Sequence, residues 1–259
     1  MISRVSAVAK PVLFLLLLIA LWDLSIRVFH VPPYLIPAPL DVIQVLIADW
    51  PDLFAQSVPT LSATLLGFVA SAVIGIPLAL LIVSSKTVED YVYPLLVFSQ
   101  SVPKVAIAPL FVVWFGFGLV PKVISAFLLG MFPVVVSAVQ GLKSVDSDLL
   151  DLARGMEADR WQIFRMVSLP SAAPAIFAGL KVSVTLTVVG AVVGEFVGGN
   201  GGLGFVLQRS IGNFELPTMF AALVLLALIG VVLFWLVEWV EKLAIPWHSS
   251  QQKSFNQGS

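Results

Sequence analysis

An all-α integral membrane protein is the fold class that this sequence predicts, and three observations predict it. Of the 259 residues, 59% are hydrophobic and 11% are charged, whereas a soluble domain carries about 25% charged residues. Six apolar runs approach or exceed the roughly 20 residues that a helix needs to cross a bilayer. The runs are continuous, whereas β-barrel strands alternate apolar and polar residues over about ten positions. The runs cover residues 12–30, 58–83, 91–118, 121–142, 173–197 and 217–243.

The first run follows Arg4 and Lys10, as the apolar part of a signal peptide does. No small-residue cleavage site follows it, so we expect a retained membrane helix. The stretch from His30 to Gln56 contains three aspartates but no lysine or arginine, which is typical of an external loop or interfacial helix. We therefore divide the chain into residues 1–56 (N-terminal helix and external loop), 57–243 (transmembrane core) and 244–259 (cytoplasmic tail).

Lysine and arginine are distributed unevenly between the two sides of the predicted membrane region. Such residues concentrate in the cytoplasmic segments of membrane proteins. The larger set therefore places both termini of this multi-pass chain in the cytoplasm. The cytoplasmic set is Arg4, Lys10, Lys86, Lys143, Arg154, Arg160, Arg165, Lys242 and Lys253, and the outer set is Arg27, Lys122 and Arg209.

The inventory of reactive side chains excludes several classes of protein. There are no cysteines and two histidines, which excludes a thiolate nucleophile, a disulfide framework and a Cys/His zinc site. We expect no catalytic residue and no metal site. A net charge of −1 gives no basic field to attract nucleic acid. The chain has no G-x-x-x-x-G-K-[ST] loop, so any ATP hydrolysis belongs to another chain.

The segment 146–169 leaves the apolar pattern and mixes charged residues with leucines at helical spacing. We expect two short helices against the inner face of the membrane. Asp148 would open the first helix, Asp159 and Gln162 have the spacing of a capping box for the second, and Pro170 would end it. A surface helix without a partner shows the same pattern, so the pattern alone leaves that alternative open.

Several motifs share their residues and spacing with one family. In the cytoplasmic segment, Asp151-Leu152-Ala153 is followed by Glu157 and then by Val167-Ser168-Leu169-Pro170. The other motifs are Leu35-Ile36-Pro37-Ala38-Pro39, Thr60 to Gly67, Gly75-Ile76-Pro77-Leu78, Pro103 through Ala108-Pro109-Leu110, Trp114-Phe115-Gly116-Phe117-Gly118, Pro170 to Pro174, Gly179-Leu180 and Gly194-Glu195. Together they resemble the nitrate, taurine and alkanesulfonate branch of the ABC importer permeases, whose signature loop has Glu-Ala-Ala, a glycine and Ile-x-Leu-Pro.

The resemblance implies a type I ABC importer permease in a bacterial inner membrane. Two copies of the permease would sit on two cytoplasmic ATP-binding subunits, and an external binding protein would deliver the solute. ATP and magnesium would be bound by the partner, and this chain would hold no cofactor. The transported solute would be small and anionic, such as a sulfonate, nitrate, bicarbonate or an aromatic acid. The branch that the chain resembles also handles pyrimidine and flavin vitamins, so the sequence alone leaves the solute open.

The resemblance also assigns the helix pair a role in coupling to the ATPase. Apolar side chains would anchor in a groove of the partner, and charged side chains would set the orientation. Glu157 stands where the family has glycine, and glutamate tolerates a positive φ poorly. Either Gly155 takes over the bend, or the bend needs no positive φ. The coupling residues are Leu149, Asp151, Leu152, Ala153, Arg154, Met156, Glu157, Asp159 and Arg160.

Lys104 is the main candidate for the translocation pathway, because a lysine inside the membrane region is costly unless it faces a cavity or partner. Gln100 and Ser101 would line the pathway beside it, and Pro94 and Pro103 would break the helix and expose backbone carbonyls. The alternative is that Lys104 extends to the inner surface. We also place Trp114 and Glu195 on the pathway, although packing for Trp114 and a structural or gating role for Glu195 are the simpler interpretations.

Gly190, Gly194 and Gly198 recur every four residues. They form a smooth stripe that lets another helix approach closely, either in the same subunit or in a second copy. Two other functions remain as alternatives. An ion-gradient-driven secondary transporter would explain the prolines but not the charged helix pair. An intramembrane enzyme would need a paired acid and base, and no two titratable groups have that spacing.

Overall fold

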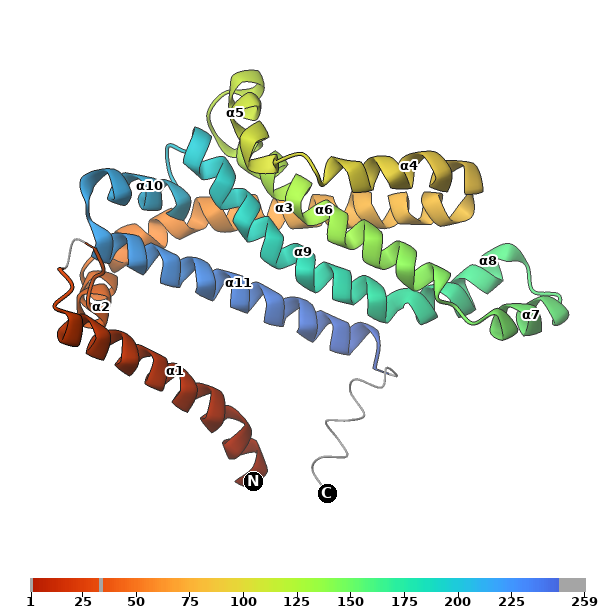
Figure 1. The fold of residues 1–259 in the computed structure, drawn as a ribbon. Helices are drawn as coiled ribbons and strands as arrows, with labels where there is room; N and C mark the ends of the chain where they lie inside the picture. The colour runs from red at the N-terminus through yellow and green to blue at the C-terminus, as the bar shows by residue number, and fades with distance from the viewer. Residues whose placement is uncertain (1, 33–34, 247–259) are drawn as a thin grey trace.

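The computed structural model describes residues 2–32 and 35–246, and every regular element among them is a helix (Figure 1). Most of the predicted tail, from residue 247 on, lies outside the described residues. Four described helices are long and apolar enough to cross a bilayer, which confirms the predicted fold class. They are α3 (Trp50–Ser84), α6 (Leu119–Lys143), α9 (Leu169–Gly198), which continues a helical segment from Arg160, and α11 (Leu216–Ala244).

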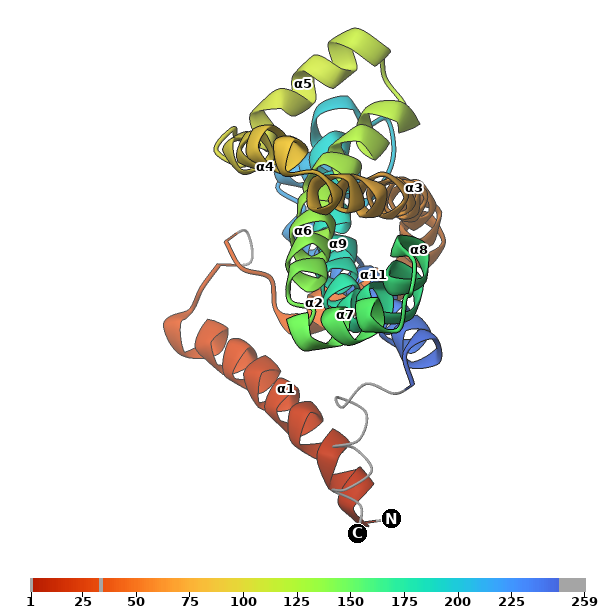
Figure 2. The ribbon, with the colours of Figure 1, turned by 90° about the vertical axis from the view of Figure 1, so that its right-hand side faces the viewer.

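The first predicted run forms most of α1 (Ile2–Phe29), which lies apart from the other helices (Figures 1 and 2). Trp22 of α1 stacks on Phe220 of α11 with ring centroids 5.6 Å apart. The predicted external stretch contains α2 (Pro39–Ala48), a short apolar helix. The boundary that we drew between residues 56 and 57 falls inside α3.

The predicted run 91–118 is not one straight helix. Of the two prolines expected to break it, Pro103 stands at the break, whereas Pro94 lies inside a helix. The run is divided into α4 (Lys86–Ser99) and α5 (Lys104–Phe115), which meet at an angle of 94°. Pro103 stands directly before α5. Proline has no N–H for a helical hydrogen bond and disfavours helical backbone at the residue before it, so α4 ends here. The bent pair would make a fifth crossing if it acts as one span.

The core lies where α3, α6 and α9 pack against one another, and α11 with α10 (Leu203–Asn213) covers the other side of α9 (Figure 2). In one half of the molecule, buried residues of α3, α6 and α9 form a cluster. The cluster comprises Ala79, Ile82, Val135, Ala138, Val139, Leu142, Ala172 and Ile176. Three of the eight are alanines, whose small side chains allow the close backbone approach on which helix packing inside a membrane depends.

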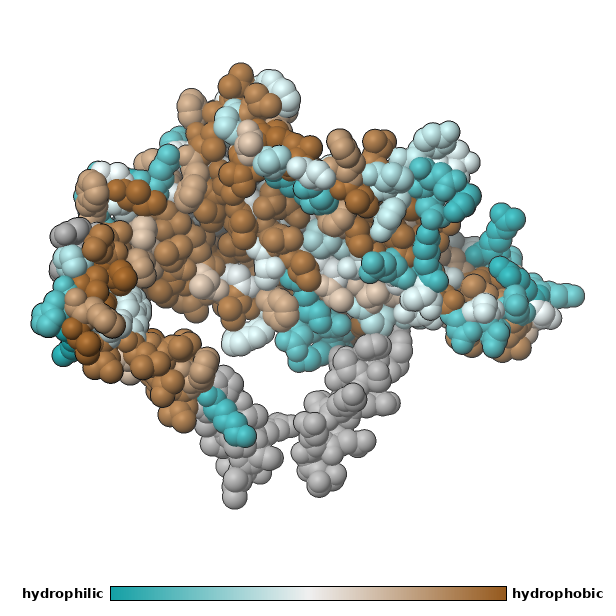
Figure 3. Space-filling view, in the orientation of Figure 1, coloured by the Kyte–Doolittle hydropathy of each residue, from teal (hydrophilic) through white to brown (hydrophobic). Residues whose placement is uncertain are grey.

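The long sides of the molecule are apolar, and hydrophilic residues gather at the end that holds α7 and α8 (Figure 3). Leucine, valine and phenylalanine side chains of all four spanning helices are exposed along these sides. A soluble protein would not expose so much apolar surface. The surface therefore fits a body surrounded by lipid, with one polar end.

The polar end consists of α7 (Ser147–Gly155) and α8 (Arg160–Ile163), and two details differ from the sequence-based prediction. Asp146, not Asp148, caps α7, because its Oδ1 accepts a hydrogen bond from the Asp148 N–H at 2.9 Å. Pro170 does not end the second helix. A π-helical turn, Phe164–Ser168, joins α8 to α9, and Pro170 occupies the first turn of α9, where a missing N–H is tolerated.

Candidate functional site

The polar end exposes large apolar side chains that no other part of the described chain covers. Leu152 is 62% exposed and Met156 is 74% exposed, and Leu149 on the same helix is also exposed. Positions 149, 152 and 156 are three and four residues apart, so they share one face of α7. Trp161 and Met166, which the sequence analysis did not single out, extend this exposed set onto the second helix. An apolar helix face of this kind fits a groove on a partner.

Glu157 forms the bend between α7 and α8 with a positive φ of 55°. The Glu157 N–H donates to Arg154 O at 3.0 Å, and the Ala158 N–H donates to Ala153 O at 3.1 Å. These two bonds define a Schellman motif, whose left-handed position is usually glycine. Both sequence-based alternatives for this bend are therefore wrong, because Glu157 itself adopts the positive φ. Gly155 is the last residue of α7 and does not have a positive φ.

The charged residues of the helix pair divide into two groups. Some are engaged within the pair: Arg154 contacts Asp151 at 2.8 Å, and Asp159 accepts from the Gln162 N–H at 2.8 Å. The Gln162 side chain accepts in turn from the Asp159 N–H at 2.9 Å, which confirms the predicted capping box. Arg160 is exposed, and none of the described residues forms an ion pair with it. Its guanidinium is therefore available to a partner.

A buried polar network holds the opposite end of the helix bundle together, and Glu195 of α9 is at its centre. The Glu195 carboxylate is 0% exposed. Its oxygens accept hydrogen bonds from Thr60 Oγ1 of α3 at 2.9 Å and from the Gly204 N–H of α10 at 2.8 Å. Lys122 Nζ of α6 lies 3.7 Å from Oε1. The Glu195 carboxylate is thus enclosed by side chains and backbone of its own subunit, and its assignment to the pathway stays a prediction.

The glycine-rich turn between α9 and α10 closes over this carboxylate. Gly202 has a φ of 110°, and a Cβ placed on it would lie 2.0 Å from Glu195 Oε1. The Gly202 N–H donates to Gln56 Oε1 at 2.7 Å, and the Leu203 N–H donates to Thr60 Oγ1 at 2.8 Å. The turn needs glycine here both for its backbone conformation and for space.

Lys122 is a member of this network that the sequence analysis missed. It was assigned only to the outer set of lysines and arginines. It is 3% exposed, and its Nζ also donates to Gly201 O at 2.6 Å. A signal was available in the sequence. Lys122 begins one spanning run and Glu195 ends another, on the same predicted side, and opposite charges at one membrane depth are expected to pair.

The glycine stripe of α9 packs within the subunit. A Cβ on Gly190 would lie 2.5 Å from Ala126 Cα, and one on Gly194 would lie 2.6 Å from Lys122 Cα, both on α6. At Gly198 the nearest atom would be Val112 Cγ2 of α5, at 2.4 Å. Neither a methyl group nor any larger side chain fits at these positions without movement of the neighbouring helix.

The break between α4 and α5 borders a cavity of about 170 Å³. Lys104 and Gln100 both line it, and Lys104 Nζ donates to Gln100 Oε1 at 2.6 Å. The ammonium lies 5.9 Å from the centre of the Phe132 ring. Ser101 is exposed next to the cavity but is not one of its lining residues. The cavity is lined by Leu96, Ser99, Gln100, Val102, Lys104, Ile107, Leu128, Met131 and Phe132.

Comparison with known proteins identifies the family. Residues 71–245, more than half of the chain, match the family described as "Binding-protein-dependent transport system inner membrane component". The chain belongs to this family. It is 38% identical to the formylaminopyrimidine transport permease protein of Halalkalibacterium halodurans, over 93% of this chain and 97% of that protein. It is 36% identical to the riboflavin transport system permease protein of Chloroflexus aurantiacus, over 94% of this chain and 91% of that protein.

Membership of the predicted branch and of the fold is also shown. The chain is 28% identical to the taurine transport system permease protein of Escherichia coli, over 92% of this chain and 89% of that protein. The solved MetNI methionine ABC transporter in an inward-facing conformation superposes with a TM-score of 0.61, over 75% of this chain and 95% of that chain, at 23% identity. The protein is thus an ABC transporter permease subunit with the type I importer fold, and the family consists of transport subunits rather than enzymes.

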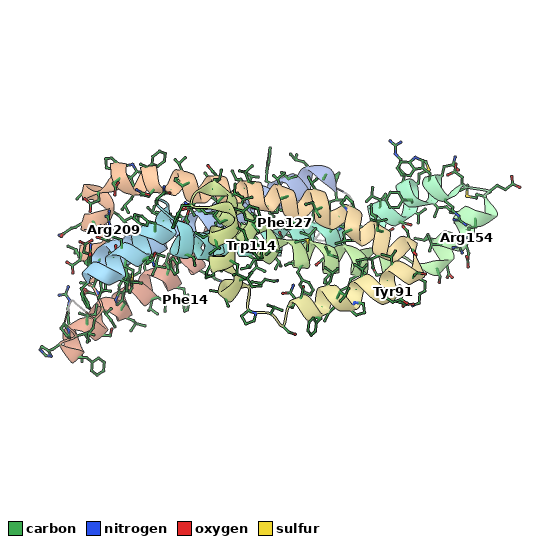
Figure 4. All side chains as sticks on the ribbon, turned by 90° about the horizontal axis from the view of Figure 1, so that it is seen from above. Phe14, Tyr91, Trp114, Phe127, Arg154 and Arg209 are labelled. Atoms are coloured by element: carbon green, nitrogen blue, oxygen red, sulfur yellow. The ribbon has the colours of Figure 1, made fainter. Side chains whose placement is uncertain are left out.

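Two further features of this permease concern its membrane helices. Trp114 is 65% exposed and lies on the outer face of α5 (Figure 4), so it does not pack in the core of the subunit. Lys181 of α9 and Glu241 of α11 form an ion pair at 2.8 Å, which the sequence analysis did not predict. This pair fixes α11 to α9, because two charges among apolar helices are stable only when they compensate each other.

Proposed function

We propose that this permease forms the translocation pathway of an ATP-driven importer and receives its motion from an ATP-binding subunit docked on α7 and α8. The observation that supports this proposal is the exposed apolar face of Leu149, Leu152 and Met156, at the polar end of the molecule. A rigid-body movement of the partner, transmitted through α8 and the continuous helix into α9, would shift the core of the bundle. ATP and Mg²⁺ would be bound by the partner chain.

The polar end would face the cytoplasm, with two ATP-binding subunits per transporter. The lysine and arginine distribution supports this orientation. Helix α11 runs from the α10 end towards the α7 and α8 end (Figure 1), which would place the C-terminus, and with an even number of crossings the N-terminus, in the cytoplasm. The opposite end, with α2 and α10, would receive the external binding protein in a bacterial inner membrane.

A second copy of the permease would cover the bent pair α4 and α5. Large side chains are exposed along this pair, among them Tyr91, Phe98, Val113 and Trp114. The pathway would then run between the two copies, past Gln100, Ser101 and Lys104. The solute would be a small molecule with an anionic or strongly hydrogen-bond-accepting group, since Lys104 and Gln100 supply a cation and an amide at the cavity.

Co-purification of the ATP-binding subunit tests the docking site. Leu152→Asp places a charge in the apolar face and should abolish co-purification and the stimulation of ATP hydrolysis by the permease. The matched control is Ile211→Asp on α10, a similarly exposed residue at the opposite end, which should retain both. Full assembly of Leu152→Asp, or solute uptake that continues without ATP hydrolysis and stops when ion gradients collapse, would contradict the proposal.

A further inference from the structure

Lys104 differs from the other lysines of the helix bundle in its surroundings. Between residues 35 and 246, each of the other five lysines lies within 4.0 Å of a carboxylate: Lys86, Lys122, Lys143, Lys181 and Lys242. No carboxylate among the described residues lies that close to Lys104. Its only described polar partner is the neutral Gln100 side chain. One of the three ammonium donors is thus engaged, and two remain.

The depth of Lys104 in the membrane makes this arrangement significant. Its ammonium faces Phe132, which lies near the middle of the 25-residue helix α6. At about 1.5 Å per residue, roughly 15–20 Å of helix extends to either side. Because Nζ lies 5.9 Å from the centre of the Phe132 ring, it stays near the middle of α6 and does not reach either end of this helix. An intramembrane cation without a counter-charge is costly and is expected to face a ligand.

The cavity beside Lys104 provides room for such a ligand. Its volume of about 170 Å³ is smaller than the roughly 300 Å³ or more of pockets for drug-sized ligands. Apart from Lys104, Gln100 and Ser99, the lining side chains are apolar or aromatic. The cavity therefore combines one cation and one amide with an apolar wall that includes the Phe132 ring.

We propose that this cavity is a binding site in the permease for the anionic group of the solute, a carboxylate or sulfonate carried on a compact apolar or aromatic body. The two remaining Lys104 donors would bind the anion, and the apolar wall would contact the body of the solute. This inference rests on the proposed transport function and deepens it. The site would favour a singly charged anion over an uncharged molecule of the same shape, because only the anion compensates the Lys104 charge.

Isothermal titration calorimetry of the complete transporter in lipid nanodiscs, with benzenesulfonate and the uncharged benzenesulfonamide as probes, tests the site. Wild type should bind the sulfonate more tightly than the sulfonamide, and Lys104→Gln should weaken sulfonate binding by about tenfold or more, since hydrogen bonds to charged groups have this strength. Lys104→Arg should preserve the preference. The matched control is Lys86→Gln, which removes an exposed lysine at the start of α4 and should bind as wild type does.

A second variant keeps the test decisive if Lys104→Gln does not fold. Gln100→Glu replaces the amide oxygen that lies 2.6 Å from the ammonium with a carboxylate oxygen. This carboxylate should compete with the sulfonate for Lys104 and weaken sulfonate binding by a similar factor. Equal affinity of wild type for both probes, or sulfonate binding unchanged in Lys104→Gln and Gln100→Glu, would overturn the inference. A separate measurement distinguishes failure of the anion site from failure of the proposed function. If the proposed function is wrong, the wild-type permease does not stimulate ATP hydrolysis by the ATP-binding subunit.

Discussion

Thr60 of α3 and Glu195 of α9 are 135 residues apart in the chain, yet Thr60 Oγ1 and Glu195 Oε1 lie 2.9 Å from each other in the buried interior. Thr60 also accepts a hydrogen bond from the Leu203 N–H, so one hydroxyl joins α3, α9 and the start of α10. The network is at the end of the bundle opposite α7 and α8. Relative movement of these helices at that end therefore requires breaking several buried hydrogen bonds together.

Thr60→Val should lower the free energy of unfolding by about 1–3 kcal/mol. Valine keeps the shape of threonine but leaves the Leu203 N–H without its acceptor and removes one of the hydrogen-bond donors to the Glu195 carboxylate. Buried polar groups that lose partners are costly. Thermal unfolding of the detergent-solubilised permease measures the change. Thr185→Val is the control, because Thr185 is exposed and bonds only within its own helix. Equal effects of the two variants would contradict the network.

Lys122→Met should destabilise the permease by about 3–5 kcal/mol, because it leaves the carboxylate of Glu195 buried without a cation. The Lys122→Met/Glu195→Gln double variant should lose less free energy of unfolding than the two single variants lose in sum, by roughly 0.5–3 kcal/mol. Unfolding free energies of all four proteins give this coupling directly. Additive losses would show that the 3.7 Å contact contributes nothing beyond the two separate side chains.

Gly190→Ala and Gly230→Ala should have opposite effects although both replace a glycine inside a membrane helix. A methyl group on Gly190 would lie 2.5 Å from Ala126 Cα, whereas nothing lies within 4 Å of one on Gly230. We expect Gly190→Ala to lower the free energy of unfolding by about 1–3 kcal/mol, because the added methyl group overpacks the contact with α6. Gly230→Ala should stabilise by up to about 1 kcal/mol through helix propensity. Unfolding midpoints that rise in both variants would argue against close packing of α9 on α6.

Arg160→Glu should weaken the binding of the ATP-binding subunit by about tenfold, because like charges placed across an interface are strongly unfavourable. Arg209→Glu makes the same change at the opposite end of the molecule and should bind normally. Figure 4 shows Arg209 far from Arg154, which lies in the same helix pair as Arg160. Titration of the purified partner onto nanodisc-embedded permease measures the affinity. Equal weakening by both variants would show a general effect of charge.

Length and apolarity predicted the fold class correctly, because a bilayer leaves few options for a continuous apolar run. Local hydrogen bonding was predicted equally well where the partners are close in sequence, as for Asp159 and Gln162. The break before Pro103 was harder to predict, because Pro94, Pro109 and Pro133 all lie inside helices without ending them. Proline alone therefore does not decide where a membrane helix ends.

The buried network was missed for a different reason. Lys122 and Glu195 are 73 residues apart in the chain, and only the packing of α6 against α9 brings them together. Positive-inside reasoning assigns a lysine to one side of the membrane but does not show which side chain it pairs with, so it did not reveal the contact of Lys122 with Glu195. Pro170 was misread because sequence patterns do not reveal a π-helical turn, which lets the backbone continue from α8 into α9. Long-range pairing and irregular helical turns both depend on tertiary packing.

The Schellman turn at Glu157 leads to the last prediction. A left-handed backbone costs a residue with a Cβ about 1–2 kcal/mol, and Glu157 has a φ of 55°. Glycine removes this strain but adds conformational freedom to the unfolded chain, which offsets part of the gain. Glu157→Gly should therefore stabilise the α7–α8 turn by about 0.5–1 kcal/mol.

Hydrogen exchange of the Glu157 and Ala158 amides measures this local stability, because both N–H groups are bonded within the turn. Protection should increase in Glu157→Gly. Ala158→Gly is the matched control: its backbone has no positive φ, so glycine relieves no strain there and should reduce protection. Loss of protection in both variants would mean that the glutamate is held in this conformation by contacts worth more than its strain. The turn would then depend on the Glu157 side chain and not on backbone conformation alone.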